Sequence, residues 1–163
     1  MSPLMFLVLA AIGLVGAVQV VLQRNPVVSA LYLVLAFMSL AGMYVLLSAP
    51  FLAAVQVVVY AGAIMVLFVF AIMVLIPGKE ETGPDPRRGV RLLAVPVGAL
   101  LLLMLVFVVA VRLRGAPAPS APAGTVTAVG RLLFTSYLFP FELTSVLLLA
   151  AMVGVLLLAR RRA

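Results

Sequence analysis

Two polar side chains, Gln56 and Tyr60, interrupt a long uncharged stretch of the sequence and are the first candidates for chemistry. They stand four residues apart, so in an α-helix both lie on one face, where they can form hydrogen bonds with another helix or with water. Three small residues follow directly, Ala61, Gly62 and Ala63. Glycine in mid-helix costs about 1 kcal/mol relative to alanine. The local sequence leaves two interpretations open, a patch for close helix packing or a place where the helix changes its winding.

One acid, Glu142, lies close to an apolar run, whereas the other three acids share a single loop. A carboxylate inside a membrane span is typical of proton-linked chemistry or of helix pairing. The second interpretation is an interfacial acid in the first turn of a helix, where the helix dipole stabilises negative charge. Pro140, two residues earlier, suits a helix start. Both interpretations remain open for Glu142.

The sequence contains neither cysteine nor histidine, and its one lysine, Lys79, lies in a predicted loop. This chain therefore supplies no disulfide, no thiolate nucleophile, no cysteine ligand for an iron–sulfur cluster and no histidine ligand for haem or zinc. A chain that pumped protons alone should carry several ionisable groups inside its spans. We therefore expect no cofactor and no metal on this chain, and no catalysis by the isolated chain.

The composition predicts a membrane protein, since 67% of the 163 residues are apolar and the mean hydropathy is +1.39. A soluble domain is nearer 45–50% apolar. The net charge of +7 comes from basic residues that flank apolar runs, which favours lipid headgroups over nucleic acid as their partner. We predict an all-α fold, one integral membrane domain over residues 1–163, with five transmembrane helices. The predicted spans are residues 3–22, 28–47, 52–76, 90–111 and 138–159.

Short and long connections alternate along the chain. Residues 48–50 form a turn short enough to join antiparallel neighbours, so the second and third spans should form a helical hairpin. Residues 77–89 carry three prolines, three glycines and six charges, which is typical of a solvated loop. Residues 112–131 are rich in alanine and proline and predict a flexible connector.

The basic residues predict the orientation, because positive charge accumulates in the cytoplasmic loops of membrane proteins. With five spans, one side receives eight basic residues and the other receives three. The N-terminus is then outside and the C-terminus is cytoplasmic. The cytoplasmic group is Arg24, Lys79, Arg87, Arg88, Arg91, Arg160, Arg161 and Arg162, and the outer group is Arg112, Arg114 and Arg131.

Three segments resemble subunit J of the respiratory NADH:quinone oxidoreductase, complex I. Residues 56–70 (QVVVYAGAIMVLFVF) resemble the third helix of that small membrane subunit, and this motif is specific. Residues 24–27 (RNPV) match the turn after its first helix, and residues 141–149 (FELTSVLLL) resemble the start of its fifth. The resemblance covers nearly the whole chain except residues 89–138.

This resemblance implies a subunit of a bacterial inner membrane that holds no cofactor, while NADH, FMN, iron–sulfur clusters and quinone are bound by partner subunits. It implies small neighbouring membrane subunits, the quinone-site subunit and antiporter-like subunits as partners. It also implies a third helix that switches between an α-helical form and a π-bulge near the Tyr-Ala-Gly segment, opening and closing a water path for protons. Glu142 matches an acid of the family's fifth-helix motif. The implied switch and proton path comprises Gln56, Tyr60, Ala61, Gly62, Ala63 and Met65.

Two other hypotheses compete with a coupling subunit. One is a scaffold whose third helix is fixed, in the same complex or in a related complex fed by ferredoxin or another reduced carrier. The other is a small self-contained transporter or channel. Few ionisable residues and no internal repeat argue against the transporter.

Overall fold

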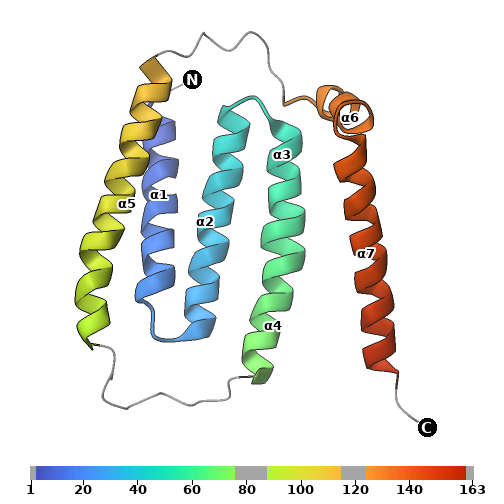
Figure 1. The fold of residues 1–163 in the computed structure, drawn as a ribbon, viewed down its shortest axis with the longest axis horizontal. Helices are drawn as coiled ribbons and strands as arrows, with labels where there is room; N and C mark the ends of the chain where they lie inside the picture. The colour runs from blue at the N-terminus through green and yellow to red at the C-terminus, as the bar shows by residue number, and fades with distance from the viewer. Residues whose placement is uncertain (1–2, 76–87, 115–123, 161–163) are drawn as a thin grey trace. The chain divides into compact units, whose positions relative to one another are not determined.

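Helices make up the part of the chain that the computed structural model describes, residues 3–75, 88–114 and 124–160, and no strand occurs in these ranges (Figure 1). The predicted all-α class is confirmed there. Four helices are long and apolar enough to cross a bilayer core of about 30 Å. They are α1 (Pro3–Leu22), α2 (Pro26–Leu46), a third helix of three segments (Pro50–Leu75) and α7 (Leu138–Ala159).

A capped turn separates α1 from α2. The side-chain oxygen of Asn25 accepts hydrogen bonds from the backbone N–H groups of Val27 at 2.9 Å and Val28 at 3.4 Å. These two bonds satisfy donors that the start of a helix leaves unpaired, and Pro26 fits the first helical position because it has no N–H to satisfy. This cap begins α2 at Pro26, two residues before the predicted start of the second span.

Two serine hydroxyls of α2 join it to α1. Ser39 donates a hydrogen bond to the backbone oxygen of Leu9, and Ser29 donates one to the backbone oxygen of Val20. Ser39 is buried. A hydroxyl surrounded by apolar groups needs such a partner, because burying it without a hydrogen bond costs free energy. The two contacts lie toward opposite ends of the pair, so they hold α1 and α2 side by side along their length.

The turn after α2 is a Schellman motif built on a serine. Ser48 has φ 58°, the left-handed conformation that glycine usually adopts at this position. The N–H of Ala49 donates to the oxygen of Tyr44 at 2.9 Å, and the N–H of Ser48 donates to the oxygen of Val45 at 3.0 Å. Pro50 then begins the next helix. These hydrogen bonds satisfy carbonyl groups at the end of α2 that have no partner within the helix. The left-handed conformation of Ser48 lets the chain reverse direction within three residues.

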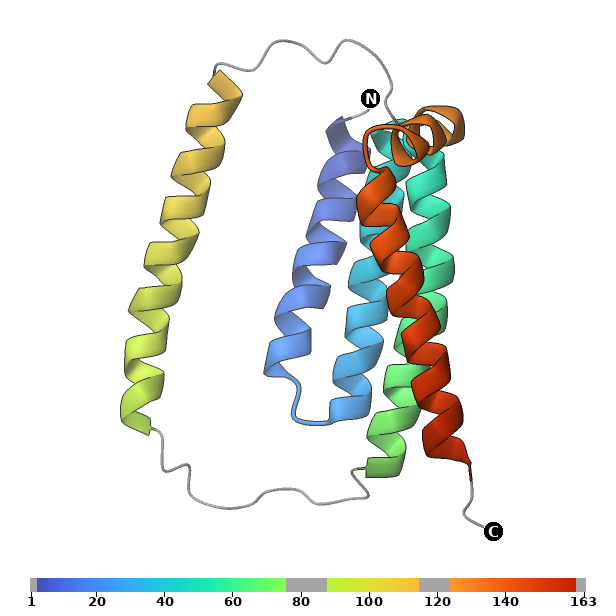
Figure 2. The same ribbon diagram turned by 45° about the vertical axis from the view of Figure 1, so that its right-hand side comes forward.

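The third helix consists of α3 (Pro50–Val55), the π-helix η1 (Gln56–Ile64) and α4 (Met65–Leu75). α2 packs against both α3 and η1, so the hairpin predicted for the second and third spans is present. α1 and α2 run antiparallel, and so do α2 and the third helix, as Figures 1 and 2 both show.

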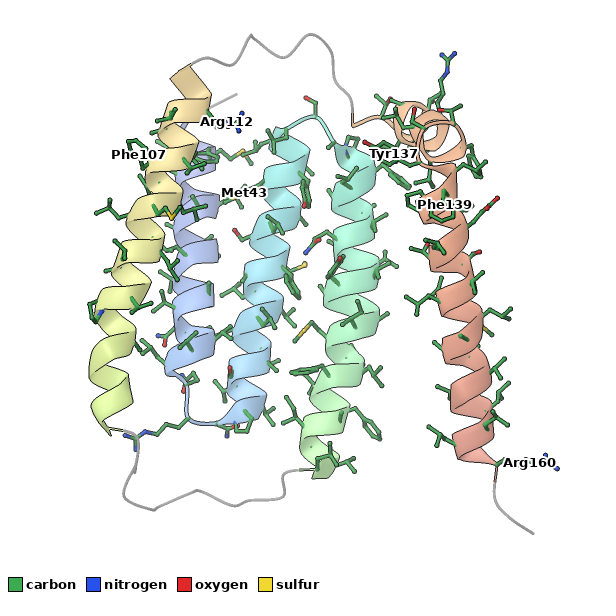
Figure 3. All side chains as sticks on the ribbon, in the orientation of Figure 1. Met43, Phe107, Arg112, Tyr137, Phe139 and Arg160 are labelled. Carbon is green, nitrogen blue, oxygen red and sulfur yellow. The ribbon has the colours of Figure 1, made fainter. Side chains whose placement is uncertain are left out.

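The predicted fourth span, residues 90–111, falls within α5 (Arg88–Arg114), a helix of 27 residues that forms a unit of its own. Its apolar part, Pro96–Arg112, is shorter than the four candidate spans. Figure 3 shows Phe107 within this part and Arg112 toward its end. The count of five spans therefore stays a prediction, as does the orientation that depends on it.

The connector predicted over residues 112–131 is wrong at its end, where α6 (Val126–Phe134) forms a short helix. The hydroxyl of Thr125 caps its start. α6 lies across the beginning of α7, as Figures 1 and 2 show, and the rings of Phe134 and Phe141 join the two helices with centroids 5.2 Å apart at 67°. Residues 115–123 and the loop residues 76–87 lie outside the described ranges.

Candidate functional site

The π-helix η1 occupies the middle of the third helix, at the residues where the sequence suggested a change of winding. In a π-helix each N–H bonds to the carbonyl five residues back, so every turn holds one residue more than an α-helical turn. At the end of η1 the N–H of Met65 donates to the oxygen of Tyr60, five residues earlier, and to that of Gly62. Short π-helical segments inside α-helices occur often at functional sites. The segment Gln56–Ile64 is therefore the candidate functional site.

Gln56 and Tyr60 differ in exposure although they stand four residues apart. Gln56 is 6% exposed, whereas Tyr60 is 45% exposed. Four residues make slightly more than one α-helical turn but less than one π-helical turn, so the two side chains are not stacked as an α-helix would stack them. Gln56 begins η1 inside the packed part of the bundle, while Tyr60 lies nearer its surface.

Tyr60 contacts a residue on α2 that the sequence did not single out. The rings of Tyr60 and Phe37 meet edge to face, with centroids 5.7 Å apart and planes at 69°. Such aromatic pairs contribute about 0.5–1.5 kcal/mol beyond the area they bury. The sequence showed only that Phe37 is an aromatic residue on the helix predicted to face the third span. That information does not identify it as the partner of Tyr60.

Gly62 lies beside its own helix backbone and not beside another described helix. A Cβ placed on Gly62 would be 3.2 Å from the backbone oxygen of Val57, and no atom of another described helix comes within 4 Å of it. Among the described residues, Gly62 therefore does not serve as a contact point for a closely packed neighbouring helix. Its lack of a side chain instead leaves room for the carbonyl that faces it across the wide turn.

The other predicted residues of the segment lie in graded environments. Ala61 is half-buried and Ala63 is exposed. Met65, the first residue of α4, is 3% exposed, whereas every other residue of α4 is half-buried or exposed. The third helix is thus packed against the chain through α3, the start of η1 and Met65, while α4 offers most of its surface to its surroundings.

Glu142 lies apart from this segment on another helix. It is the fifth residue of α7, one position beyond the first turn, and its side chain is exposed. The expected place in the first turn is therefore wrong by one position. Its backbone oxygen accepts a hydrogen bond of 2.7 Å from the hydroxyl of Ser145. No hydrogen bond that the structure describes joins Glu142 to η1.

The exposed surface of α7 is apolar apart from Glu142, Thr144 and Ser145 near its start. No side chain in the most apolar window of this helix is buried within the described residues. Figure 3 shows apolar side chains projecting around α7, with Phe139 near its start and Arg160 at its end. Lipid chains or apolar faces of other proteins are the surroundings that such a surface requires.

The candidate functional site offers hydrogen-bonding groups. The described residues contain no group of three or more His, Cys, Asp or Glu side chains that could hold a metal ion. η1 contributes an amide at Gln56, a phenol at Tyr60 and backbone carbonyls whose hydrogen-bond partners depend on the winding. The amide and the phenol can each donate and accept hydrogen bonds, and the carbonyl oxygens can accept them.

Known proteins match the chain along most of its length. Residues 16–158 match the family model of NADH-ubiquinone/plastoquinone oxidoreductase chain 6. NAD(P)H-quinone oxidoreductase chain 6 of Synechocystis sp. is 42% identical over 159 residues, 96% of this chain and 79% of the relative. NADH-quinone oxidoreductase subunit J of Rhodobacter capsulatus is 36% identical over 96% of this chain and 80% of its own length.

A third relative has a different electron donor in its name. F(420)H(2) dehydrogenase subunit J of Methanosarcina mazei is 34% identical over 159 residues, 95% of this chain and 89% of the relative. The matched residues 16–158 include α2, η1 and all but the last residue of α7. The chain therefore belongs to the NADH-ubiquinone/plastoquinone oxidoreductase chain 6 family.

Proposed function

We propose that this chain is a membrane subunit of a proton-translocating NADH:quinone oxidoreductase and that it holds no cofactor of its own. Membership of the family and the names of its relatives support this assignment. NADH, FMN, the iron–sulfur clusters and quinone then belong to partner subunits, since this sequence has neither cysteine nor histidine. The exposed apolar surfaces of α4 and α7 are suited to other membrane subunits, including small neighbours, the quinone-site subunit and antiporter-like subunits.

The third helix of this subunit helps couple quinone reduction to proton pumping by changing its winding. The observation that carries this proposal is the π-helix over Gln56–Ile64. If one π turn narrows to an α turn, the helix beyond it rotates by about 100°, the angle between successive residues. Ala53 and Gln56, each 6% exposed, anchor the helix before this point. In this proposal α4 is the part that turns, and the side chain of Met65, 3% exposed, leaves its present packing when it does so. The rotation of α4 opens and closes a path for water and protons.

The scaffold hypothesis has one observation in its favour. α1 and α2 are joined by the hydroxyls of Ser29 and Ser39, which is what a fixed structural frame requires. A scaffold would serve equally well in a related complex fed by ferredoxin or another carrier, and the relative named for F420H2 dehydrogenase belongs to such a complex. Only the scaffold predicts that residues 56–64 keep one winding throughout turnover.

The proposed location is the inner membrane of a bacterial cell, with the N-terminus outside and the C-terminus in the cytoplasm. Four apolar helices of 20 to 26 residues support the membrane location. The eight basic residues assigned to one side support the orientation.

Gly62→Val tests the coupling role. A Cβ at this position contacts the Val57 oxygen at 3.2 Å, and the two branches of valine crowd the wide turn further. We expect normal amounts of assembled complex, because no other described helix contacts Gly62. Quinone-linked turnover and proton pumping should fall at least tenfold, which corresponds to about 1.4 kcal/mol. NADH oxidation by an artificial acceptor should stay near normal.

Tyr60→Phe should give a milder loss of quinone-linked turnover and proton pumping than Gly62→Val, since it removes only a hydroxyl.

Gly98→Val in α5 is the matched control, because a Cβ there has no described neighbour within 4 Å. It should leave pumping per assembled complex unchanged. Native-gel quantification beside both activity measurements separates assembly from turnover. Wild-type pumping per assembled Gly62→Val complex would show that the third helix does not switch, in favour of the scaffold.

A further inference from the structure

We propose that Phe37 of α2 is a positioning residue for the third helix. Its ring holds Tyr60 toward α2 while residues 56–64 are π-helical, and the two rings separate when the winding changes. This inference rests on the proposed switching of the third helix and adds to it a residue on a different helix.

The ring geometry carries the first step. The centroids of Phe37 and Tyr60 lie 5.7 Å apart and the ring planes meet at 69°, an edge-to-face arrangement in which the positive edge of one ring faces the negative face of the other. This attraction depends on orientation, so rotating one ring away removes it. Tyr60 is 45% exposed although it makes this contact, so its side chain is not enclosed within the described residues.

The position of Phe37 carries the second step. It stands two residues before Ser39, whose hydroxyl bonds to the Leu9 oxygen of α1, and Ser39 is 3% exposed. This part of α2 is therefore held against α1 and does not follow movements of the third helix. Phe37 presents its ring from the fixed helix, and Tyr60 meets it from the helix that changes.

The register of η1 carries the third step. The carbonyl of Tyr60 accepts the N–H of Met65 in the π form, and an α turn would transfer that N–H to the carbonyl of Ala61. In this proposal the turn that narrows is the first turn of η1, so Tyr60 lies beyond it and rotates together with α4. The aromatic contact then exists in one form and is lost in the other. A contact that differs between two states shifts their populations, whereas one present in both does not.

Substitution of each ring tests the pair in the assembled complex. Phe37→Leu and Tyr60→Leu each keep an apolar side chain and remove the aromatic contact, so each should lower quinone-linked turnover roughly two- to tenfold. The double variant should be no slower than the worse single variant, because the two residues act through one contact. Phe37→Tyr retains a ring and should restore most of the turnover. Tyr44→Leu, another aromatic residue of α2, is the control and should turn over normally.

A spectroscopic measurement reports the contact without reference to activity. With 4-fluorophenylalanine in place of Phe37, the fluorine resonance of the assembled complex should have a component shifted by the ring of Tyr60. Tyr60→Leu should remove that component, and Gly62→Val should change its share of the signal. A resonance that Tyr60→Leu leaves unchanged would overturn the proposal, and so would additive losses of turnover in the double variant.

The outcomes separate this inference from the proposed function. If Gly62→Val reduces turnover but Phe37→Leu does not, the helix switches and Phe37 has no positioning role. If Gly62→Val changes neither turnover nor the fluorine spectrum, the switch itself is absent and the positioning role falls with it.

Discussion

At the scale of single residues, the meaning of a spacing depends on the kind of helix that carries it. Gln56 and Tyr60 were paired from a four-residue spacing that assumes 3.6 residues per turn. In the wider turn of η1 one is buried and the other is nearly half exposed. Gly62 indicated from the sequence that this segment could change its winding. No sequence feature predicted the hydrogen bonds between residues five apart, which place the side chains of Gln56 and Tyr60 in different environments. Phe37 escaped notice because its importance lies in a contact with another helix.

Glu142 provides the residue-scale prediction. Its side chain is exposed and lies near the start of α7, one position beyond the first turn, so we expect an interfacial acid that water or headgroups reach. Glu142→Gln should therefore lower NADH:quinone activity and proton pumping by less than about threefold, or ~0.7 kcal/mol.

Both rates should be measured per assembled complex. Normal assembly with pumping abolished would instead make Glu142 a member of the proton path and would refute the interfacial assignment.

At the scale of elements, long apolar runs predicted the long helices correctly, whereas the short helix α6 was not predicted. The first and fifth predicted spans coincide with α1 and α7, because a long, predominantly apolar segment can satisfy its backbone hydrogen bonds in lipid by forming a helix. α6 was missed because its nine residues follow an alanine- and proline-rich stretch that dominates the composition. The cap at Thr125 and the apolar spacing of Val126, Val129 and Leu133 were the signals that could have located it.

The α1–α2 pair provides the element-scale prediction. Gly16 is buried, and a Cβ there would be 3.2 Å from the Tyr32 oxygen and 3.3 Å from the Ala36 nitrogen. Both atoms belong to the backbone of α2, so the helices must move apart to accept a larger residue. Gly16→Val should lose assembled complex and activity in the same proportion.

Native gels and turnover measured on the same membranes test this expectation, with Gly98→Val as the control. Full assembly of the Gly16→Val complex would show that α1 and α2 need not approach this closely.

At the scale of the whole molecule, the chain has too little interior to stand alone. Its buried apolar residues within the described ranges are four alanines and one methionine, and large apolar side chains are exposed on every candidate span. Side-chain packing between spans and neighbouring proteins replaces the core of a soluble domain. Composition predicted this membrane setting, but it could not predict which faces meet protein and which meet lipid, since both surroundings select the same side chains.

The number of crossings provides the prediction at this scale. Because the chain has no native cysteine, single introduced cysteines can be labelled without background. Arg24→Cys, in the connection between α1 and α2, should react with a membrane-impermeant thiol reagent from the cytoplasmic side. Thr127→Cys on α6 should react with the same reagent from outside.

These two sites lie on opposite sides only if α5 crosses the membrane. Cytoplasmic labelling at both sites would leave α5 on the cytoplasmic side and reduce the count to four spans. A reversed pattern would invert the orientation.

The π-helix also implies an unusual tolerance to changes in chain length. Loss of one residue from an α-helical membrane span rotates everything after it by about 100° and misdirects each later side chain. Within Gln56–Ile64 the chain already carries a surplus residue, so deleting Ala61 should leave a continuous α-helix in which α3 and α4 keep their present faces. Such a shortened subunit should assemble but be fixed in one winding, whereas deletion of Leu67 in α4 should prevent assembly. In the proposed mechanism, the surplus residue that a simple helix would exclude is what allows the span to move.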